Sequence, residues 1–328
     1  MNDLNDEYNN ARDGLVKDYI EIPLLSLVVP VFNESESLKI FLEKIYEALK
    51  KINKLRFEII FINDGSNDET LEKLLHFKKD LKEIVVIDLS RNFGKEAALT
   101  AGLDMCKGNI VIPIDVDLQD PPELISKMVD SWRDGYEVVL ARRISRKSDS
   151  LLKRKTAKWF YSTIGKISDV AIPENVGDFR LMDRKVVDAL KLLPENGRFM
   201  KGLFAWIGFR TTLIDFERID RSEGITKFNT WKLWNLAIDG ITSFSIIPLR
   251  LSTYIGFIIA LAAVGYGAYI LWMTLNNGVE LPGYSSLIVS ITFLSGIQLI
   301  GIGIIGEYLG RTYIESKRRP VYVVRDVH

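Results

Sequence analysis

An acidic stretch at residues 115–123, DVDLQDPPE, directly follows GNIVIPI, a run typical of a buried strand. If the chain stays extended there, alternate side chains share one face, so Asp115, Asp117 and Gln119 point the same way and the apolar residues between them point toward the core. Carboxylate and amide oxygens suit a hard divalent cation such as Mg²⁺ or Mn²⁺. The stretch therefore predicts a metal site formed by these three residues.

The acids that end the same stretch have a structural interpretation. Asp120 is followed by Pro121, Pro122 and then Glu123. An acid, a proline and a second acid at this spacing are typical of an N-cap, a first helical position and a capping-box partner. We therefore expect a helix that begins here and runs to about Trp132.

Two long apolar spans lie near the C-terminal end of the sequence, at residues 252–275 and 284–306. Between Leu251 and Gly306 the only charged side chain is Glu280. Each span exceeds the roughly 20 residues that a helix needs to cross a bilayer. The segment NNGVELPG between them is short and holds Gly and Pro, as a tight turn does. The sequence predicts a transmembrane hairpin, and the span lengths disfavour the alternative of a buried core hairpin.

The charges that flank the spans predict the orientation of the hairpin. One arginine, Arg250, precedes the first span, and the second span is followed by Arg311, Lys317, Arg318 and Arg319. The turn between the spans has no Lys or Arg. By the positive-inside rule, the N-terminal part of the chain and both termini are expected in the cytoplasm.

Composition narrows the class of protein further. Residues 1–22 are polar and acidic, which predicts a flexible tail and no signal peptide. The single cysteine, Cys106, lies in a helical pattern and cannot form an internal disulfide, in agreement with a reducing compartment. A net charge of zero gives no reason to expect nucleic-acid binding.

The region before the hairpin alternates apolar β-rich runs with helical stretches. The runs lie at residues 24–32, 57–63, 84–90, 109–115 and 136–141, and the helical stretches lie near 34–53, 67–80, 94–107 and 121–134. This alternation predicts an α/β domain with a doubly wound, mostly parallel sheet that binds ligands at the carboxyl ends of its strands. No G-x-G-x-x-G follows the first run and no G-x-x-x-x-G-K-[ST] occurs, so dinucleotide dehydrogenases and P-loop NTPases are disfavoured.

Five segments in register carry a family resemblance over about residues 25–320. They read VVPVFNE, FINDGSNDET, RNFGKEAALTAGL, DVDLQDPPE and DFRLMDR, and they precede the hairpin. Together they resemble the GT-A glycosyltransferases of family two, specifically the polyprenyl-phosphate glycosyltransferases related to bactoprenol glucosyltransferases and dolichol-phosphate mannose synthase. The resemblance implies inverting, metal-dependent transfer of a hexose from a nucleotide sugar to polyprenyl phosphate. Glucose from UDP-glucose and undecaprenyl phosphate are the expected substrates, while GDP-mannose, UDP-GlcNAc and UDP-galactose stay open as donors.

The resemblance also implies which residues hold the donor. The expected nucleotide-sugar residues are Pro30, Phe32, Glu34, Asp64, Lys95, Asp115 and Asp117. Local structure offers an alternative for part of this set, because Asp64 and Gly65 form a good turn pair. Ser66 and Glu69 likewise have the spacing of a capping box.

The acceptor sets different requirements, since a phosphate monoester is already an anion at neutral pH. The resemblance places Asp178 where the family has a suspected base, and we expect it to orient the acceptor or the sugar, its role as a base remaining open. Two anions repel, so positive charge is needed to bring the acceptor to the diphosphate. The candidate cations are Arg142, Arg143, Arg180, Arg198 and Lys227.

Two further stretches have the character of membrane-surface segments. Residues 142–158 are basic and lead into AKWFYSTIGKI, and residues 229–250 place aromatic and aliphatic side chains at helical spacing. Basic and amphipathic helices bind anionic membranes, although core packing is the alternative interpretation. The expected organisation is a GT-A domain at 23–228, juxtamembrane amphipathic helices, the hairpin within 251–310 and a basic cytoplasmic tail at 311–328.

The resemblance implies partners and leaves alternative functions to test. The implied partners are a second copy of the chain, packed through the hairpins, a flippase and a downstream glycosyltransferase. A processive polysaccharide synthase is disfavoured, because neither of the two glutamines, Gln119 and Gln298, begins a Q-x-x-R-W motif. A membrane-anchored, non-catalytic scaffold and a nucleotide-sugar hydrolase are the remaining alternatives.

Overall fold

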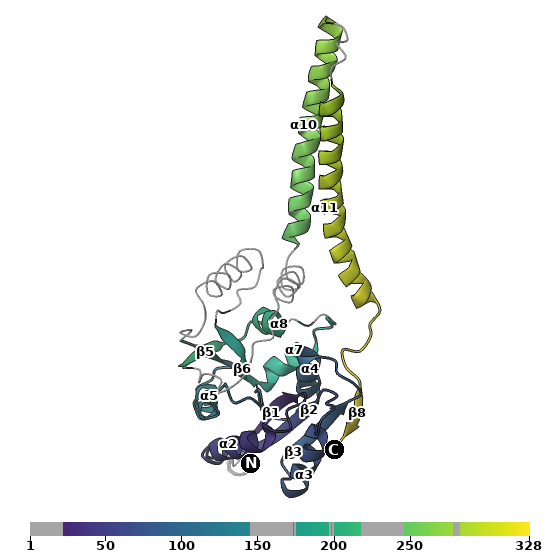
Figure 1. The fold of residues 1–328 in the computed structure, drawn as a ribbon. Helices are drawn as coiled ribbons and strands as arrows, with labels where there is room; N and C mark the ends of the chain where they lie inside the picture. The colour runs from purple at the N-terminus through teal and green to yellow at the C-terminus, as the bar shows by residue number, and fades with distance from the viewer. Residues whose placement is uncertain are drawn as a thin grey trace, which may run out of the picture.

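The computed structural model describes residues 22–144, 173, 175–196, 198, 200–217, 246–277 and 283–328. Within these residues, eight strands form one sheet in the order β7-β5-β6-β4-β1-β2-β3-β8. The sheet and its helices make a head, from which a long hairpin of two helices extends (Figure 1).

The centre of the sheet is parallel, as predicted. Its strands are β1 (Leu24–Val31), β2 (Arg56–Asn63), β3 (Ile84–Leu89) and β4 (Ile110–Pro113), and they pair in parallel in the order β4-β1-β2-β3. The connecting helices are α2 (Leu38–Lys50), α3 (Thr70–Asp80), α4 (Lys95–Met105) and α5 (Leu124–Arg133). Near-continuous apolar runs form these strands because both faces of the sheet are covered.

A separate hydrophobic core lies on each face of the sheet. On one face, α2, α3 and α5 contribute Phe41, Leu74 and Ile125 to the first core. On the other, Leu99 of α4 packs in a core completed by α7 (Arg184–Lys191) and α8 (Met200–Trp206). Helices on both faces are the defining feature of a doubly wound fold, so the predicted fold class is confirmed.

Three further strands extend the sheet beyond β4. Strand β6 (Val176–Asp183) lies between β4 and β5 (Val138–Arg143) and runs antiparallel to both, while β7 (Thr211–Phe216) pairs in parallel with β5. Because β6 runs against β4, its first residues lie at the carboxyl edge of the central strands. The antiparallel direction of β6 therefore carries Asp178 to the edge where ligands are expected.

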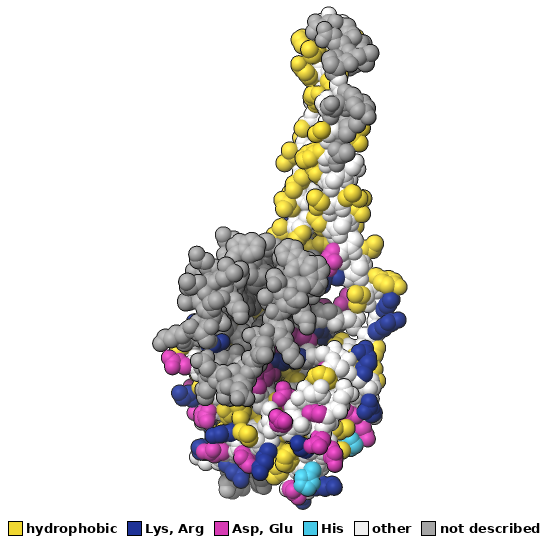
Figure 2. Space-filling view, in the orientation of Figure 1, with side chains coloured by type: hydrophobic (Ala, Val, Ile, Leu, Met, Phe, Trp, Pro, Cys, Tyr) yellow, Lys and Arg dark blue, Asp and Glu magenta, His cyan; other side chains and the backbone are white. Residues whose placement is uncertain are grey.

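The hairpin consists of α10 (Ile247–Asn277) and α11 (Tyr284–Ser316), which lie side by side (Figure 1). By length and composition, both helices could cross a membrane. Their large side chains are exposed, with Phe257 63%, Trp272 64% and Leu299 68% accessible. Figure 2 shows hydrophobic side chains along the hairpin and charged ones spread over the head. Such a large apolar surface indicates contact with lipid or with another protein.

The segment after α11 contains a strand that the sequence analysis does not predict. Residues 311–328 are expected to form a basic tail, but Val324–Val327 form strand β8, which pairs antiparallel with β3. The His328 N–H donates to the Val86 carbonyl at 2.8 Å, and the Ser90 N–H donates to the Val323 carbonyl at 2.9 Å. The chain thus returns from the hairpin to the edge of the sheet.

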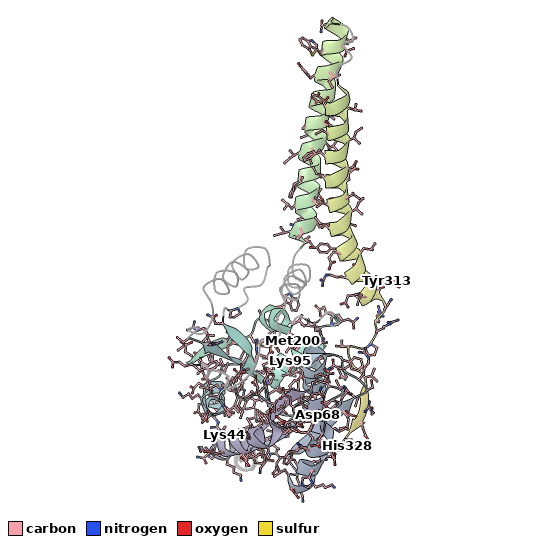
Figure 3. All side chains as sticks on the ribbon, in the orientation of Figure 1. Lys44, Asp68, Lys95, Met200, Tyr313 and His328 are labelled. Carbon is pink, nitrogen blue, oxygen red and sulfur yellow. The ribbon has the colours of Figure 1, made fainter. Side chains whose placement is uncertain are left out.

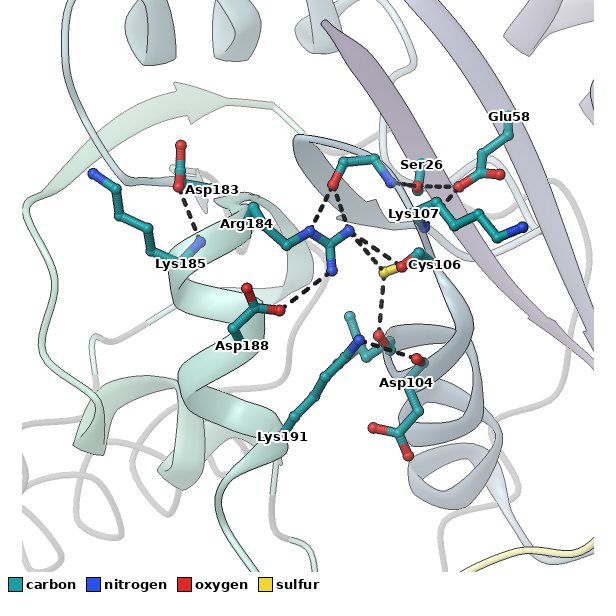
Figure 4. Close-up of polar contacts among 12 residues, drawn as sticks. Ser26, Glu58, Asp104, Cys106, Lys107, Asp183, Arg184, Lys185, Asp188 and Lys191 are labelled. Carbon is teal, nitrogen blue, oxygen red and sulfur yellow. Dashed lines mark hydrogen bonds and ion pairs between the residues drawn. The ribbon is translucent and has the colours of Figure 1, made fainter.

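A polar cluster closes the amino edge of the sheet, opposite the expected site (Figure 4). We call Ser26, Glu58, Cys106, Gly108 and Arg184 the amino-edge cluster. The Arg184 guanidinium donates to the carbonyls of Gly108 at 2.8 Å and Cys106 at 3.2 Å. The Gly108 N–H donates to the Ser26 hydroxyl at 2.7 Å, which is also bonded to Glu58. These bonds tie the start of α7 to the end of α4 and to β1.

Two predicted helix caps are wrong. Helix α5 begins at Leu124, its N-cap is Glu123 and it has no side-chain cap bond. Pro122 disfavours helical conformation at Pro121, so the helix cannot begin there, and a turn brings the Leu124 N–H to the Pro121 carbonyl at 3.1 Å.

The second wrong cap is the Ser66–Glu69 capping box. Helix α3 begins at Thr70, and the Thr70 N–H donates to the Asp68 carboxylate at 3.0 Å. The Ser66 hydroxyl instead accepts the Asn33 N–H at 2.9 Å, which ties the loop after β2 to the loop after β1. These polar residues connect neighbouring loops at the carboxyl edge.

Several predicted segments lie outside the described residues. They are the N-terminal tail up to residue 21, most of the basic stretch at 142–158, the juxtamembrane helix up to residue 245, and Lys227.

Candidate functional site

The loops that follow β1, β2, β3 and β4 meet at the carboxyl edge of the sheet, where a parallel sheet binds its ligands. Lys95, the first residue of α4, lies in the half of the head that faces the hairpin, whereas Lys44 and His328 lie in the far half (Figure 3). The predicted site therefore faces the apolar hairpin.

Three charged residues from three elements form an ion-paired group, which we call the carboxyl-edge triad. The Lys95 ammonium lies 2.8 Å from the Asp115 carboxylate and 3.0 Å from the Asp178 carboxylate. Burial by itself lowers the pKa of Lys95, but the two carboxylates outweigh burial and the net pKa is raised. The ammonium therefore stays protonated at neutral pH and pairs with both carboxylates.

A small cavity adjoins the triad. Its polar and proline lining consists of Pro30, Lys95, Pro113, Asp115, Asp120 and Asp178. Sequence reasoning missed Asp120 as a site residue, because it interpreted this acid as a helix cap. The available signal was its place as a third carboxylate in the stretch that holds Asp115 and Asp117.

The acidic stretch itself does not continue the strand. Strand β4 ends at Pro113, and Leu118 adopts a left-handed conformation with φ 53°. Asp117 is exposed, while Gln119 is only 8% exposed. The expectation that both side chains share one face of an extended segment is therefore wrong, since the backbone turns between them.

The residues of this turn still include the side-chain types that a divalent cation prefers. Within the part of the chain that the structure describes, the Gln119 side-chain amide nitrogen is buried without a hydrogen-bond partner, so this donor can still bond an acceptor group of a ligand. Among the described residues, no three His, Cys, Asp or Glu side chains are grouped as metal ligands. Mg²⁺ is commonly held by one or two carboxylates together with water and substrate phosphates. Asp115 and Asp117 supply carboxylates and Gln119 an amide oxygen, the ligand types of such a set, although the turn at Leu118 separates Asp117 from Gln119.

Asp64 is fixed by the loop that follows β3. Its carboxylate accepts the Phe93 N–H at 2.7 Å and the Gly94 N–H at 2.9 Å. Burial raises the pKa of Asp64, and these two bonds offset only part of that effect. Next to it, Gly65 has φ +65°, and a Cβ there would lie 2.5 Å from the Arg91 carbonyl carbon. The loops after β2 and β3 are therefore packed as one unit that only glycine permits.

The loop after β1 holds the remaining predicted donor residues. Phe32 is 42% exposed, at the end of β1. The Glu34 carboxylate accepts the Ser37 hydroxyl at 3.0 Å, and the Glu34 N–H donates to Thr70 Oγ1 at 3.0 Å. This loop is thereby held against the start of α3 and leaves the Phe32 ring accessible.

Arg180 is a buried cation beside the triad. It is 5% exposed, stacks 4.0 Å from the Phe204 ring centroid and donates to the Gly177 carbonyl at 2.6 Å. Burial lowers its pKa to about 10, although Asp178 acts in the opposite direction. Asp178 and Arg180 are two residues apart on β6, so they share one face of the strand. Arg180 therefore adds positive charge close to the triad.

The other candidate cations have separate positions. Arg142 pairs with Asp215 through two bonds of 2.6 and 2.9 Å at an exposed position. Arg198 donates to the carbonyls of Glu195 at 3.2 Å and Leu193 at 2.9 Å. It lines another cavity together with Lys317. Neither Arg142 nor Arg198 lines the cavity at the triad.

Two family models match the chain. The model described as glycosyl transferase family 2 matches residues 26–191, and the model described as the GtrB C-terminal hairpin matches residues 247–312. The first region contains the central sheet and the triad, and the second contains almost all of α10 and α11.

Similar proteins extend over nearly the whole chain. An uncharacterized glycosyltransferase, sll0501 of Synechocystis, is 53% identical over 92% of this chain and 95% of that protein. The prophage bactoprenol glucosyl transferase homolog of Escherichia coli K12 is 52% identical over 92% and 99%, and the bactoprenol glucosyl transferase of Shigella phage SfV is 52% identical over 92% and 98%.

Solved structures are more remote. The mannosyltransferase PcManGT from Pyrobaculum calidifontis, solved with GDP-Man and Mn²⁺, is 16% identical over 92% of this chain and 93% of that chain, with a TM-score of 0.44. A likeness of this degree supports no inference about substrate or metal. Because the family model spans half of the chain and relatives above 50% identity span nine-tenths of it, the chain belongs to glycosyltransferase family 2 and carries a GtrB-type C-terminal hairpin.

Proposed function

We propose that the protein transfers glucose from UDP-glucose to the phosphate of undecaprenyl phosphate, with inversion at the anomeric carbon. The product would be a polyprenyl-phosphate sugar that serves cell-envelope glycosylation. The observation that carries this proposal is the identity of about 52% to proteins named bactoprenol glucosyl transferase, which extends through the hairpin as well as the catalytic domain.

The donor is held by the loops at the carboxyl edge. Pro30, Phe32, Glu34 and Asp64 surround the nucleoside, and the fixed geometry of Asp64 supports this role, because its loop is already ordered by backbone bonds. Preorganised groups cost little free energy to order when the ligand binds.

Asp117 and Gln119 would hold Mg²⁺ or Mn²⁺ beside the diphosphate, with Asp115 in support. A divalent cation at this place stabilises the negative charge that develops on the leaving diphosphate. Asp117 is suited to the task because its carboxylate is exposed, where it can reach a cation that also binds the donor phosphates. Gln119 would bind the cation through its amide oxygen.

Lys95 and Asp178 act on the reacting groups. The ammonium of Lys95 offsets the charge of Asp115 and Asp178, so the donor diphosphate does not meet uncompensated carboxylates. Asp178 orients the acceptor or the sugar, and no strong base is required because the lipid phosphate is an anion at neutral pH.

The acceptor phosphate needs positive charge near the diphosphate. Arg180 supplies a fixed cation behind Asp178, and Arg142, Arg198 and Lys227 are proposed to guide the phosphate from the membrane surface. The contacts of Arg142 and Arg198 place both outside the triad cavity, which supports a role in approach rather than in the transfer step.

The lipid acceptor explains the exposed hairpin. We propose that α10 and α11 cross the cytoplasmic membrane, with the head and both termini in the cytoplasm. The support is the apolar surface of both helices together with the basic residues that follow α11. In this arrangement the site faces the bilayer that contains the polyprenol.

The test uses the full chain in detergent with Mg²⁺ or Mn²⁺, undecaprenyl phosphate and a panel of labelled nucleotide sugars, with label counted in the organic phase. We expect label from UDP-glucose, lost with EDTA. Label from GDP-mannose, UDP-GlcNAc or UDP-galactose alone would overturn the choice of sugar. Donor binding without lipid labelling would overturn the choice of acceptor, and no donor binding would favour the scaffold alternative.

A further inference from the structure

The segment that follows the hairpin, residues 320–328, is fastened to the head at several points, and we call it the C-terminal strap. Besides its pairing with β3, its Tyr322 hydroxyl donates to Asp104 at 2.9 Å. The Arg325 guanidinium donates to Asp88 at 3.1 Å and to the Ser90 carbonyl at 2.7 Å. None of these contacts belongs to the triad.

The contact with Asp88 concerns a buried charge. The Asp88 side chain is 3% exposed at the end of β3, and its carboxylate accepts from Asn63 at 2.7 Å and from Arg325. A buried carboxylate is stable only when it is paired and hydrogen-bonded. Among the described residues, Arg325 is the cation bonded to it.

Both contacts of Arg325 lead to the loops that fix Asp64. Through Asp88 it reaches Asn63, whose side-chain oxygen accepts the Ser66 N–H at 3.3 Å and which directly precedes Asp64. Through Ser90 it holds the first residue of the loop whose N–H groups bind the Asp64 carboxylate. Arg325 thus holds the start of both loops.

The close packing at Gly65 makes these two loops interdependent. A Cβ at this position would lie 2.5 Å from the Arg91 carbonyl carbon and 2.6 Å from the Asn92 nitrogen, so the loops touch through their backbones. A shift of the loop after β3 would therefore move the loop after β2 with it. Packed contacts of this kind transmit displacements because they leave no slack.

We propose that Arg325 is a positioning residue for the donor site, through which the strap sets the geometry of the loops around Asp64. The inference rests on the proposed function in one respect, that these loops hold the nucleotide. Its consequence is that donor affinity depends on a segment placed after the membrane hairpin.

The test measures the dissociation constant of UDP-glucose and separate KM values for donor and acceptor, with the full chain in detergent. Arg325→Ala should weaken donor binding about three- to tenfold and leave the acceptor KM unchanged, in the range found for coupling through packed networks. Arg325→Lys should restore part of the affinity. Tyr322→Phe removes another strap contact that leads to α4, and it should leave donor binding unchanged.

A second variant separates positioning from charge compensation. Arg325→Ala combined with Asp88→Asn removes the buried charge but keeps an oxygen acceptor for Asn63. We expect the melting temperature to recover while donor binding stays weak, because the Ser90 anchor is still missing. Donor affinity that recovers together with the melting temperature would overturn the positioning role.

Donor binding by the wild type and by Asp64→Ala distinguishes this inference from the proposed function. If Asp64→Ala weakens UDP-glucose binding but Arg325→Ala does not, the inference alone is overturned. Donor binding that does not respond to Asp64→Ala would remove its premise, and the inference would then fail with that assignment.

Discussion

A polar cluster that contains a cation lies at each end of helix α4, and the two clusters do different things. At its start, Lys95 pairs with Asp115 and Asp178, and these side chains line a cavity. At its end, Arg184 donates to the carbonyls of Cys106 and Gly108 and thereby connects α7 to the central strands (Figure 4). Lys95 joins side chains to one another, whereas Arg184 joins a side chain to backbone carbonyls.

This difference indicates which cluster is available for chemistry. Lys95 is 46% exposed and Asp115 37%, and a side-chain ion pair can be exchanged for a ligand without unfolding the chain. The Arg184 guanidinium donates to the carbonyls of two buried residues, Cys106 and Gly108, and losing such bonds destabilises the fold. Each cluster contains a cation and an acid, and the two cations differ in their hydrogen-bond acceptors, which are carboxylates for Lys95 and backbone carbonyls for Arg184.

The largest expected effect is at the predicted metal ligand. Asp117→Ala should abolish transfer, a loss of at least about 10²–10³-fold, because charge stabilisation of the leaving group is usually the largest catalytic contribution. The melting temperature should not change, since Asp117 is exposed. Radiolabel transfer to lipid and thermal unfolding measure the two effects. Asp130→Ala, an exposed acid on α5, is the control, and turnover at the wild-type rate in Asp117→Ala would contradict the metal assignment.

A smaller effect is expected when the triad loses its cation. Lys95→Met leaves Asp115 and Asp178 close together without the ammonium, and we expect kcat/KM to fall by about 10–100-fold as the diphosphate meets two carboxylates. Steady-state kinetics with UDP-glucose measures the loss. Lys95→Arg keeps the charge and should retain more activity than Lys95→Met. Equal activity in both variants would show that the charge of Lys95 has no role.

A substitution in the amino-edge cluster should lower stability and leave substrate binding unchanged, the reverse of what is expected at Asp117. Arg184→Ala removes charged hydrogen bonds to Gly108 and Cys106 and should destabilise the head by about 2 kcal/mol, with unchanged donor and acceptor KM in the folded protein. Thermal unfolding and kinetics at a temperature below the transition separate the effects. Lys185→Ala, an exposed neighbour on α7, is the control. If Arg184→Ala changed the donor or acceptor KM without lowering the melting temperature, the amino-edge cluster would serve the reaction as the triad does.

The smallest effect is expected at the exposed pair of Arg142 and Asp215. If Arg142 guides the lipid phosphate, Arg142→Ala should raise the acceptor KM by about threefold, while Asp215→Ala frees the guanidinium and should not raise it. Exposed ion pairs contribute little to stability, so the melting temperature should be the same in both variants. Equal increases in KM in both variants would assign the pair a structural role only.

Much of the fold could be predicted from the sequence. The apolar runs that form β1 to β4 are long enough to identify, and the helices between them start and end close to the predicted residues. The acidic stretch also pointed to the correct edge of the sheet. Pro30, Lys95, Asp115 and Asp178, all predicted through the family resemblance, line one cavity in the structure.

Other parts of the site could not be predicted from local pattern. Asp120 has the spacing of an N-cap, but two consecutive prolines delay the helix and leave this acid beside the cavity. Asp117 and Gln119 alternate as in a strand, but Leu118 adopts a left-handed conformation and separates them. In each case the backbone departs from the regular geometry on which the spacing argument depends.

The sequence by itself determined the alternating sheet and helices, the apolar hairpin and the family, because these are encoded in periodicity and motifs within short windows. Only the tertiary structure decided that Asp178 returns to the site on an antiparallel strand, that Arg180 is buried and that Arg325 reaches Asp88 from 237 residues away. These pairings depend on which edges and faces remain open after the central strands pack. A short and half-polar strand such as β8 has no pattern of its own, and it forms because the edge of β3 offers unpaired backbone groups.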